Sequence, residues 1–216
     1  MNKPNLLIFA SGTKDGGGSG FENLVKASER GELQANIVAV VSNHEHGGVA
    51  QRAKKLGINF IYFPTPWTAE SYRKIAEENG ADFVALSGWL KMVVGLNPKN
   101  TFNIHPGPLP AFGGVGMYGH HVHEAIMEAY KKGEVKSSGV TMHFVTDDKQ
   151  YDRGPIFFEA EVPIMPDDTA ETLARRVNGA EHKWQPTITN KVVTGEISWD
   201  GQNRDSLVGY TNIKAD

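Results

Sequence analysis

Short apolar segments alternate with longer amphipathic segments through the first part of the chain. The apolar segments have the length of buried strands, and the segments between them carry apolar residues at helical spacing. The predicted strands cover residues 6–10, 37–41, 60–62 and 83–86, and the predicted helices cover residues 21–30, 48–56 and 69–79. Buried strands that alternate with helices indicate βαβ units. We therefore expect an α/β fold with a Rossmann-like, mainly parallel sheet flanked by helices.

The pattern changes after residue 136, where apolar and polar residues begin to alternate. This alternation marks two half-buried strands, at residues 140–145 and 156–162. We expect them to form a hairpin around a long loop at residues 146–154. Antiparallel strands are therefore predicted in the C-terminal half, and the sheet is predicted to be mixed.

A last helix is predicted to begin near Asp168. Asp168 and Glu171 have the spacing of a capping box. Glu181 lies close to the apolar stripe, so its carboxylate either sits at the solvated edge of the helix or faces a cleft. The predicted buried stripe contains Leu173, Val177 and Trp184.

The rest of the chain is expected to add a small C-terminal hairpin and nothing larger. Residues 195–216 contain Ile197 and Trp199 and then become polar, which indicates a short hairpin followed by a mobile tail. No repeat or linker divides the sequence. We expect residues 1–216 to form a single domain.

Composition and charge favour a small-molecule function. The 216 residues are 39% hydrophobic and carry a formal charge of -3, which gives no basic field for nucleic acid or anionic membranes. The absence of Cys excludes disulfides and thiolate chemistry. The first apolar run is too short for a signal peptide, and no stretch is long enough to cross a bilayer. We expect a cytoplasmic monomer or homodimer with small-molecule partners.

Residues 102–110 carry the most informative chemistry. Asn103 and His105 lie two residues apart at the end of an apolar run, so both side chains should leave the same face of a strand. Three prolines follow at Pro106, Pro108 and Pro110 and force the chain out of the sheet as a rigid loop. Taken alone, the segment could also be an exit turn with an incidental histidine.

A glycine-rich segment at residues 11–20 joins the first strand to the first helix. Such a turn lets backbone N–H groups and a helix N-terminus surround a phosphate, although a flexible surface loop remains the alternative. The segment lacks the Gly-Lys-Ser/Thr of a P-loop, and Phe21 replaces the last glycine of the dinucleotide fingerprint. A phosphate site is therefore expected without a nicotinamide cofactor.

Aspartates in the hairpin loop could supply a carboxylate to His105. Asp152 would raise the pKa of the imidazole and stabilise the imidazolium, or it could simply begin a turn before Gly154. Two rival sites are weaker. A Ser-His-Asp triad lacks the Gly-x-Ser-x-Gly elbow. The clustered histidines at residues 44–46 and 120–123 lack acidic partners at ligand spacing, so we predict no metal site.

Together these segments resemble the folate-dependent formyltransferases, and most closely the branch that acts on glycinamide ribonucleotide in purine biosynthesis. The resemblance extends from about residue 6 to the last helix. Its anchors are Asn103-Ile104-His105-Pro106 with Leu109-Pro110, Gly139 to Thr146 followed by Asp152-Arg153-Gly154-Pro155, and Ala180-Glu181-His182.

The resemblance implies that a formyl group passes from 10-formyltetrahydrofolate, as co-substrate, to the amine of glycinamide ribonucleotide. The implied catalytic residues are Asn103, His105 and Asp152. The implied substrate contacts are Gly18, Ser19, Gly20, Pro106 and Glu181. The implied folate contacts are Trp89, Leu90, Lys91, Met92, Val93 and Asp148.

Departures from the family pattern leave some assignments open. The glycine loop carries the additional Lys14-Asp15, and two residues are added before Asp152, which makes Asp148 a fallback carboxylate. The alternatives are a formyltransferase that acts on an amino-sugar nucleotide and a noncatalytic phosphoribosyl- or folate-binding protein.

Overall fold

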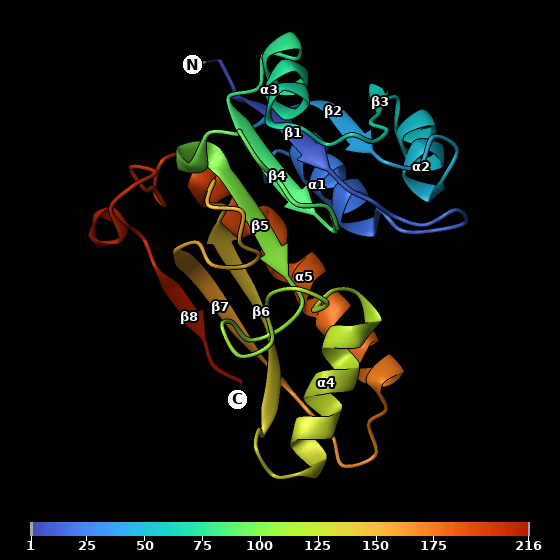
Figure 1. Cartoon of the computed structure of the whole chain (residues 1–216), viewed down its shortest axis with the longest axis vertical. Helices are drawn as coiled ribbons and strands as arrows, with labels where there is room; N and C mark the ends of the chain where they lie inside the picture. The colour runs from blue at the N-terminus through green and yellow to red at the C-terminus, as the bar shows by residue number, and fades with distance from the viewer. Residues whose placement is uncertain (1, 216) are drawn as a thin grey trace.

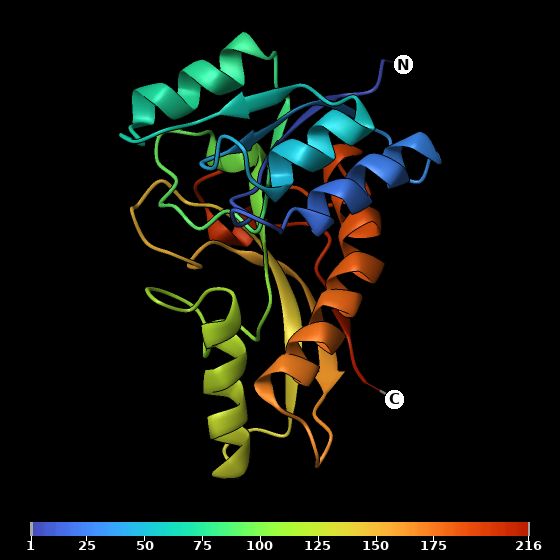
Figure 2. The same cartoon turned by 90° about the vertical axis from the view of Figure 1, so that its right-hand side faces the viewer.

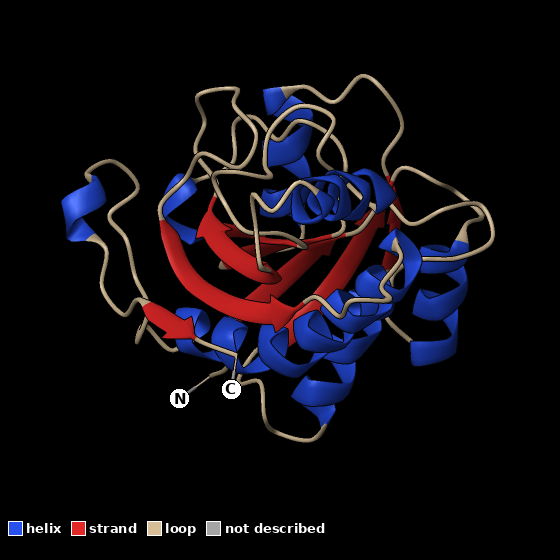
Figure 3. Cartoon of the chain, turned by 90° about the horizontal axis from the view of Figure 1, so that it is seen from below, coloured by secondary structure: helices blue, strands red, loops and turns tan. Residues whose placement is uncertain are grey.

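A single sheet runs through the chain, with helices on both of its faces (Figures 1 and 3). The computed structural model describes residues 2–215. Over these residues the sheet has eight strands in the order β3-β2-β1-β4-β5-β6-β7-β8. The first five strands are parallel, β6 is antiparallel to both β5 and β7, and β8 is parallel to β7. The predicted mixed α/β fold is confirmed.

The strands and helices follow the predicted alternation closely. The strands are β1 (Asn5–Phe9), β2 (Asn36–Ser42), β3 (Phe60–Tyr62), β4 (Phe83–Ser87), β5 (Thr101–His105), β6 (Ser137–Phe144), β7 (Ile156–Pro163) and β8 (Thr211–Ile213). The helices are α1 (Ser19–Glu29), α2 (Gly48–Leu56), α3 (Ala69–Glu78), α4 (His120–Lys131) and α5 (Ala170–Val193). Short 3-10 turns occur at Pro98–Asn100 and Arg204–Ser206.

Two apolar cores lie on the two faces of the sheet. Because strand side chains alternate, Leu6 and Ile8 of β1 enter one core while Leu7 and Phe9 enter the other. The first core takes residues from α1, α2, α4 and α5, and the second takes Tyr72 of α3. None of the helices within residues 2–215 has the length and apolar character needed to cross a bilayer.

Helix α4 is an element that the sequence interpretation did not predict. Its buried residues include Val122, Ile126 and Ala129, which have helical spacing. In sequence, its first turn is a cluster of histidines, which was interpreted as a rival metal site and not as the start of a helix. Figure 2 shows α4 beside the first half of α5, and this contact buries its apolar face.

The N-cap of helix α5 lies one residue after the expected N-cap, Asp168. Thr169, not Asp168, caps the helix, and Thr172 completes the capping box in place of Glu171. The helix then continues through Pro186 to Val193. Proline cannot donate to the carbonyl four residues earlier, but the Asn23 side-chain amide on α1 donates to the His182 carbonyl at 2.7 Å. This bond satisfies the carbonyl that Pro186 leaves unpaired.

The C-terminal segment contributes to the sheet as well as forming a short hairpin. Ser198 and Val208 form an isolated antiparallel bridge, and Trp199 between them is buried. The chain then adds β8 to the edge of the sheet beside β7. Part of the expected polar tail is therefore an edge strand.

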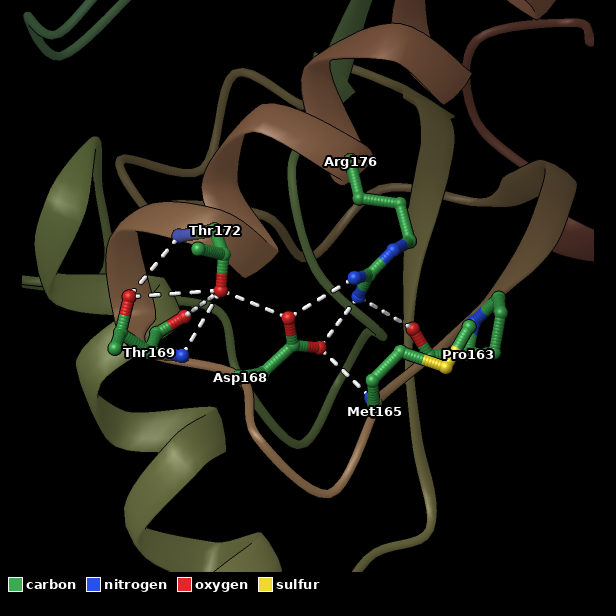
Figure 4. Close-up of polar contacts among 6 residues, drawn as sticks. All are labelled: Pro163, Met165, Asp168, Thr169, Thr172 and Arg176. Carbon is green, nitrogen blue, oxygen red and sulfur yellow. Dashed lines mark hydrogen bonds and ion pairs between the residues drawn. The ribbon is translucent and has the colours of Figure 1, made fainter.

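A half-buried ion pair, in which the Asp168 carboxylate is buried and Arg176 is partly exposed, fixes the loop between β7 and α5 (Figure 4). Asp168 receives a bidentate contact from Arg176, and its carboxylate also accepts from the Met165 N–H and the Thr172 hydroxyl, both at 2.7 Å. Arg176 additionally donates to the Pro163 carbonyl at 3.0 Å. The Arg176 guanidinium and these donors hold the pKa of Asp168 far below its ordinary value.

We expect Arg176→Ala to lower the free energy of unfolding in urea by about 2 kcal/mol, because a buried carboxylate loses its charged partner. A carboxyl group with a depressed pKa stabilises the fold above its unfolded pKa of about 4, and this contribution disappears on acidification. The variant should therefore lose less stability than the wild type between pH 5 and pH 3.

Arg175→Ala is the matched control, since Arg175 forms only an exposed pair with Glu171 at 3.9 Å. Its unfolding free energy should change by less than about 0.5 kcal/mol. Equal losses in the two variants would contradict a specific role for the Asp168–Arg176 pair.

Candidate active site

A cavity of about 510 Å³ opens where β1, β4 and β5 end. The strand order reverses between β1 and β4, because the chain runs outward to β2 and β3 and then returns to the other side of β1. Parallel α/β sheets bind ligands at the carboxyl ends of their strands at such a reversal. The cavity lining comes from the glycine loop, the turn after β4, the end of β5, residues 114–120, the hairpin loop and α5.

Strand β5 delivers Asn103 and His105 to this cavity together, as their spacing predicts. The intervening Ile104 packs in the first apolar core. On the neighbouring antiparallel strand, His143 pairs with Asn103, and Thr141 pairs with His105. The rigid exit loop begins at Pro106, which also lines the cavity.

Asp152 brings a carboxylate to the same place from the hairpin loop. Its Oδ2 lies 3.8 Å from His105 Nδ1 and accepts from the Gly114 N–H at 2.9 Å. Its Oδ1 lies 3.4 Å from Asn103 Nδ2. The Asp152 backbone has φ of 57°, a left-handed conformation that non-glycine residues rarely adopt and that often marks functional sites.

Asp148 lies outside the cavity. Its carboxylate accepts from the Thr146 hydroxyl at 2.9 Å and from the Gln150 N–H at 3.1 Å, so it closes its own exposed turn. Of the two candidate carboxylates, Asp152 is therefore the one that faces His105.

His105 is buried, and its ring orientation is determined by one hydrogen bond. Nε2 lies 2.7 Å from the Phe112 carbonyl, which can only accept, so Nε2 carries a hydrogen and Nδ1 faces Asp152. Burial lowers the pKa of His105 more than Asp152 raises it. Asp152 raises this pKa as expected, but burial outweighs its effect and the net shift is downward, so the resting imidazole is neutral at neutral pH.

Asp152 remains ionised despite its partial burial. Burial opposes ionisation, but contacts with His143, His105 and the Gly114 N–H together lower the pKa of this carboxyl below its ordinary value. The cavity therefore holds a carboxylate beside a neutral imidazole.

His143 is a site residue that the sequence interpretation missed. Its Nδ1 donates to the Phe144 carbonyl at 2.8 Å, so Nε2 is the atom that faces Asn103 Nδ2 at 3.1 Å and Asp152 Oδ1 at 3.4 Å. His143 thus orients the Asn103 amide from the neighbouring strand, and it lies beside the Asp152 carboxylate. The predicted alternation places His143 on the opposite face of its strand from Met142 and Phe144. Only the β5–β6 register shows that it faces Asn103.

The glycine loop is held firmly against the start of α2. The Gly48 N–H donates to the Thr13 carbonyl at 3.1 Å, and Arg52 Nε donates to the Gly17 carbonyl at 2.9 Å. Gly17 and Gly18 both have positive φ, 83° and 79°, which only glycine adopts readily. The loop is therefore preformed rather than a flexible surface segment.

The three predicted phosphate contacts differ in their surroundings. Gly18 lines the cavity, whereas Ser19 and Gly20 do not. The Ser19 hydroxyl pairs with His182 Nε2 at 3.1 Å, and a Cβ on Gly20 would lie 2.3 Å from the Ser87 hydroxyl. The first bond of α1 runs from the Glu22 N–H to the Gly18 carbonyl, so the N–H groups of residues 19–21 remain at the open helix end.

The predicted folate segment after β4 divides into two parts. Trp89 and Leu90 line the cavity, together with Ser87 and Gly88. The other three residues do not line it: Lys91 lies over the Trp67 ring at 4.8 Å, the Met92 carbonyl accepts from the Tyr72 hydroxyl at 3.0 Å, and Val93 is buried in the second core.

Glu181 faces the cavity from α5 and is not at the solvated edge of the helix. Burial raises the pKa of its carboxyl to about 7, which the Asn178 amide at 3.3 Å opposes. Asn178 and His123 line the same region and were not predicted from sequence. Within residues 2–215, no three His, Asp or Glu side chains come together as a metal site.

The chain matches the formyl transferase family over residues 5–189. It is 35% identical over 213 residues to a chloroplastic phosphoribosylglycinamide formyltransferase of Vigna unguiculata, an alignment that covers 92% of this chain and 64% of that protein. A phosphoribosylglycinamide formyltransferase of Bacillus subtilis (strain 168) is 29% identical over 198 residues, covering 87% of this chain and 94% of that protein. The chain therefore spans less than two thirds of the plant protein and nearly all of the bacterial one.

Solved structures agree with these matches. The crystal structure of glycinamide ribonucleotide transformylase 1 from Symbiobacterium toebii is similar with a TM-score of 0.80 and 26% identity, covering 97% of this chain and 95% of that chain. The family resemblance predicted from the motifs is confirmed.

We expect Gly48→Ala to lower the free energy of unfolding by about 1–3 kcal/mol, because the added Cβ would lie 2.3 Å from the Gly16 carbonyl oxygen and would push the glycine loop away. Gly179→Ala is the control: it lies in the interior of α5, and an added Cβ there would meet no atom within 4 Å beyond the local helix backbone, so this change should stabilise the protein by about 0.5–1 kcal/mol. Urea unfolding of both variants measures the difference. A Gly48→Ala variant as stable as wild type would show that the loop is not held by α2.

Proposed function

The chain belongs to the formyl transferase family, and from this premise we propose that it transfers a formyl group from 10-formyltetrahydrofolate to the primary amine of glycinamide ribonucleotide, a step of purine biosynthesis. The observation that carries the proposal is the convergence of Asn103, His105 and Asp152 on one cavity from a strand and a distant loop. A protein that only binds phosphoribosyl or folate groups has no need of this arrangement.

The proposed reaction begins when the amine nitrogen attacks the formyl carbon. The carbonyl oxygen then becomes an oxyanion, and the Asn103 amide is the donor suited to stabilise it. The amine becomes positively charged and must lose a proton. Neutral His105 can take this proton at Nδ1, because Nε2 already carries a hydrogen that is bound by the Phe112 carbonyl.

Asp152 would stabilise the imidazolium at the moment it forms. Its Oδ2 lies 3.8 Å from Nδ1, close enough for strong attraction in a buried site. His105 then returns the proton to the folate nitrogen as the bond between that nitrogen and the formyl carbon breaks. The amine gains the formyl group, the folate gains the proton, and no covalent enzyme intermediate forms.

Different groups of residues in the cavity lining suit the two substrates. The preformed glycine loop and the open N-terminus of α1 are suited to the phosphate of the acceptor, and Glu181 to its polar groups. The turn after β4 contributes Trp89 and Leu90, which offer apolar surface and backbone groups for the pterin. This division supports an acceptor that carries a terminal phosphate over an amino-sugar nucleotide.

We expect His105→Ala to lower turnover by a factor of about 1,000 or more, since the proton acceptor is lost. His46→Ala is the control, because His46 is exposed outside the cavity, and it should retain normal turnover. The measurement is formyl transfer by purified protein, with glycinamide ribonucleotide and an amino-sugar nucleotide as competing acceptors. Wild-type protein that transfers nothing to the first acceptor would contradict the proposed function.

Glu181 should make acceptor binding depend on pH near neutrality. Its pKa of about 7 means that the carboxylate forms between pH 6 and pH 8. Because an ionised carboxylate accepts stronger hydrogen bonds, the Michaelis constant of the acceptor should fall as pH rises through this range. Glu181→Gln should show a smaller fall, since only the substrate's own groups still titrate. Identical pH profiles in both proteins would remove Glu181 from the acceptor site.

A further inference from the structure

His123 is a buried polar residue of the cavity that the proposed reaction does not use. It lies in the first turn of α4 and is 5% exposed. It lines the cavity together with His105, and α5 contributes Ala174 and Asn178 to the same lining. Helix α4, which carries His123, packs against the first half of α5 (Figure 2).

The His123 ring lacks a protein partner. Its Nδ1 is buried without a hydrogen bond among residues 2–215. Such an atom costs stability, and nearly all buried polar groups in folded proteins avoid it. Three other buried side chains share this property, namely those of Asn43, Ser138 and Thr189, but none of them lines the cavity. Nδ1 itself is closed off from the cavity. The other ring nitrogen, Nε2, also has no hydrogen bond within residues 2–215, so Nε2 is the atom that a ligand can reach.

The surroundings keep the ring neutral. Burial, with smaller contributions from His120 and His105, lowers the pKa of His123 to about 4. A neutral imidazole offers one hydrogen-bond donor and one acceptor. It suits hydroxyl and amide groups better than a phosphate or a carboxylate.

His123 lies near the proposed reacting centre, because it is close enough to His105 for their charges to interact. Helix α5, which packs against α4, contributes Ala174, Asn178 and Glu181 to the same lining at a spacing of about one turn. In the proposed reaction His105 acts on the acceptor amine and Glu181 contacts the acceptor, so His123 is assigned to the same substrate.

We propose that His123 is a binding residue for the acceptor substrate, hydrogen-bonding its hydroxyl or amide groups between the phosphate and the reacting amine. This inference rests on the proposed function and adds a residue that determines acceptor affinity.

Steady-state kinetics of His123→Leu test this role. Leucine fills similar space without hydrogen bonds, so the Michaelis constant of the acceptor should rise about 10-fold while that of the folate changes less than about 2-fold. His123→Asn should recover much of the loss, because its amide again offers a donor and an acceptor. His46→Leu is the control at an exposed position and should leave both constants unchanged.

Thermal unfolding without ligands separates binding from a structural role. Since Nδ1 has no protein partner, His123→Leu should unfold at the same temperature as wild type or higher. A lower unfolding temperature with both Michaelis constants raised would show that His123 is structural. An unchanged acceptor constant in an active enzyme would overturn the role of His123 alone, whereas an inactive wild type would contradict the proposed function itself.

Discussion

The carboxylate of Asp152 joins parts of the molecule that are far apart in sequence. It contacts Asn103 and His105 on β5, His143 on β6 and the Gly114 N–H in the loop before α4. The antiparallel pairing of β5 with β6 sets two of these partners opposite each other, and the left-handed backbone at Asp152 turns the carboxylate toward them. Asp152 is therefore the residue through which β5, the hairpin loop and the loop before α4 meet at the cavity.

The position of the cavity follows from the topology of the sheet. Because the strand order reverses between β1 and β4, the turns that follow these strands separate and leave room between them. The glycine loop and residues 87–90 both line it, and Ser11 joins them by hydrogen bonds to Gly88 and Leu90. The antiparallel strands β6 and β7 then extend the sheet beyond β5, which allows their connecting loop to return Asp152 to the same edge. The parallel half thus forms the cavity, and the antiparallel half supplies its carboxylate.

Local patterns predict much of this arrangement, whereas contacts between distant segments escape them. The spacing of Asn103 and His105 predicts a shared face because strand geometry has a period of two. No local pattern shows that His143 faces Asn103, because register is a property of two strands. The same limit applies to Pro186. Proline usually ends or kinks a helix, and only Asn23 of another helix satisfies the His182 carbonyl that Pro186 leaves free. Asp168 has the spacing of a cap in sequence, and only its ion pair with Arg176, two turns along the chain, shows why Thr169 caps the helix instead.

The charge state of the cavity links its burial to its chemistry. Burial shifts the pKa of His105 and His123 downward and that of Glu181 upward, so each shift favours the neutral form. Asp152 differs, because its hydrogen bonds keep it ionised. A neutral base beside a fixed negative charge is poised to accept a proton, since the cation that forms is attracted at once to its neighbour. The same burial that leaves His123 unsatisfied therefore gives Asp152 the low-dielectric surroundings in which its attraction for His105 is strongest.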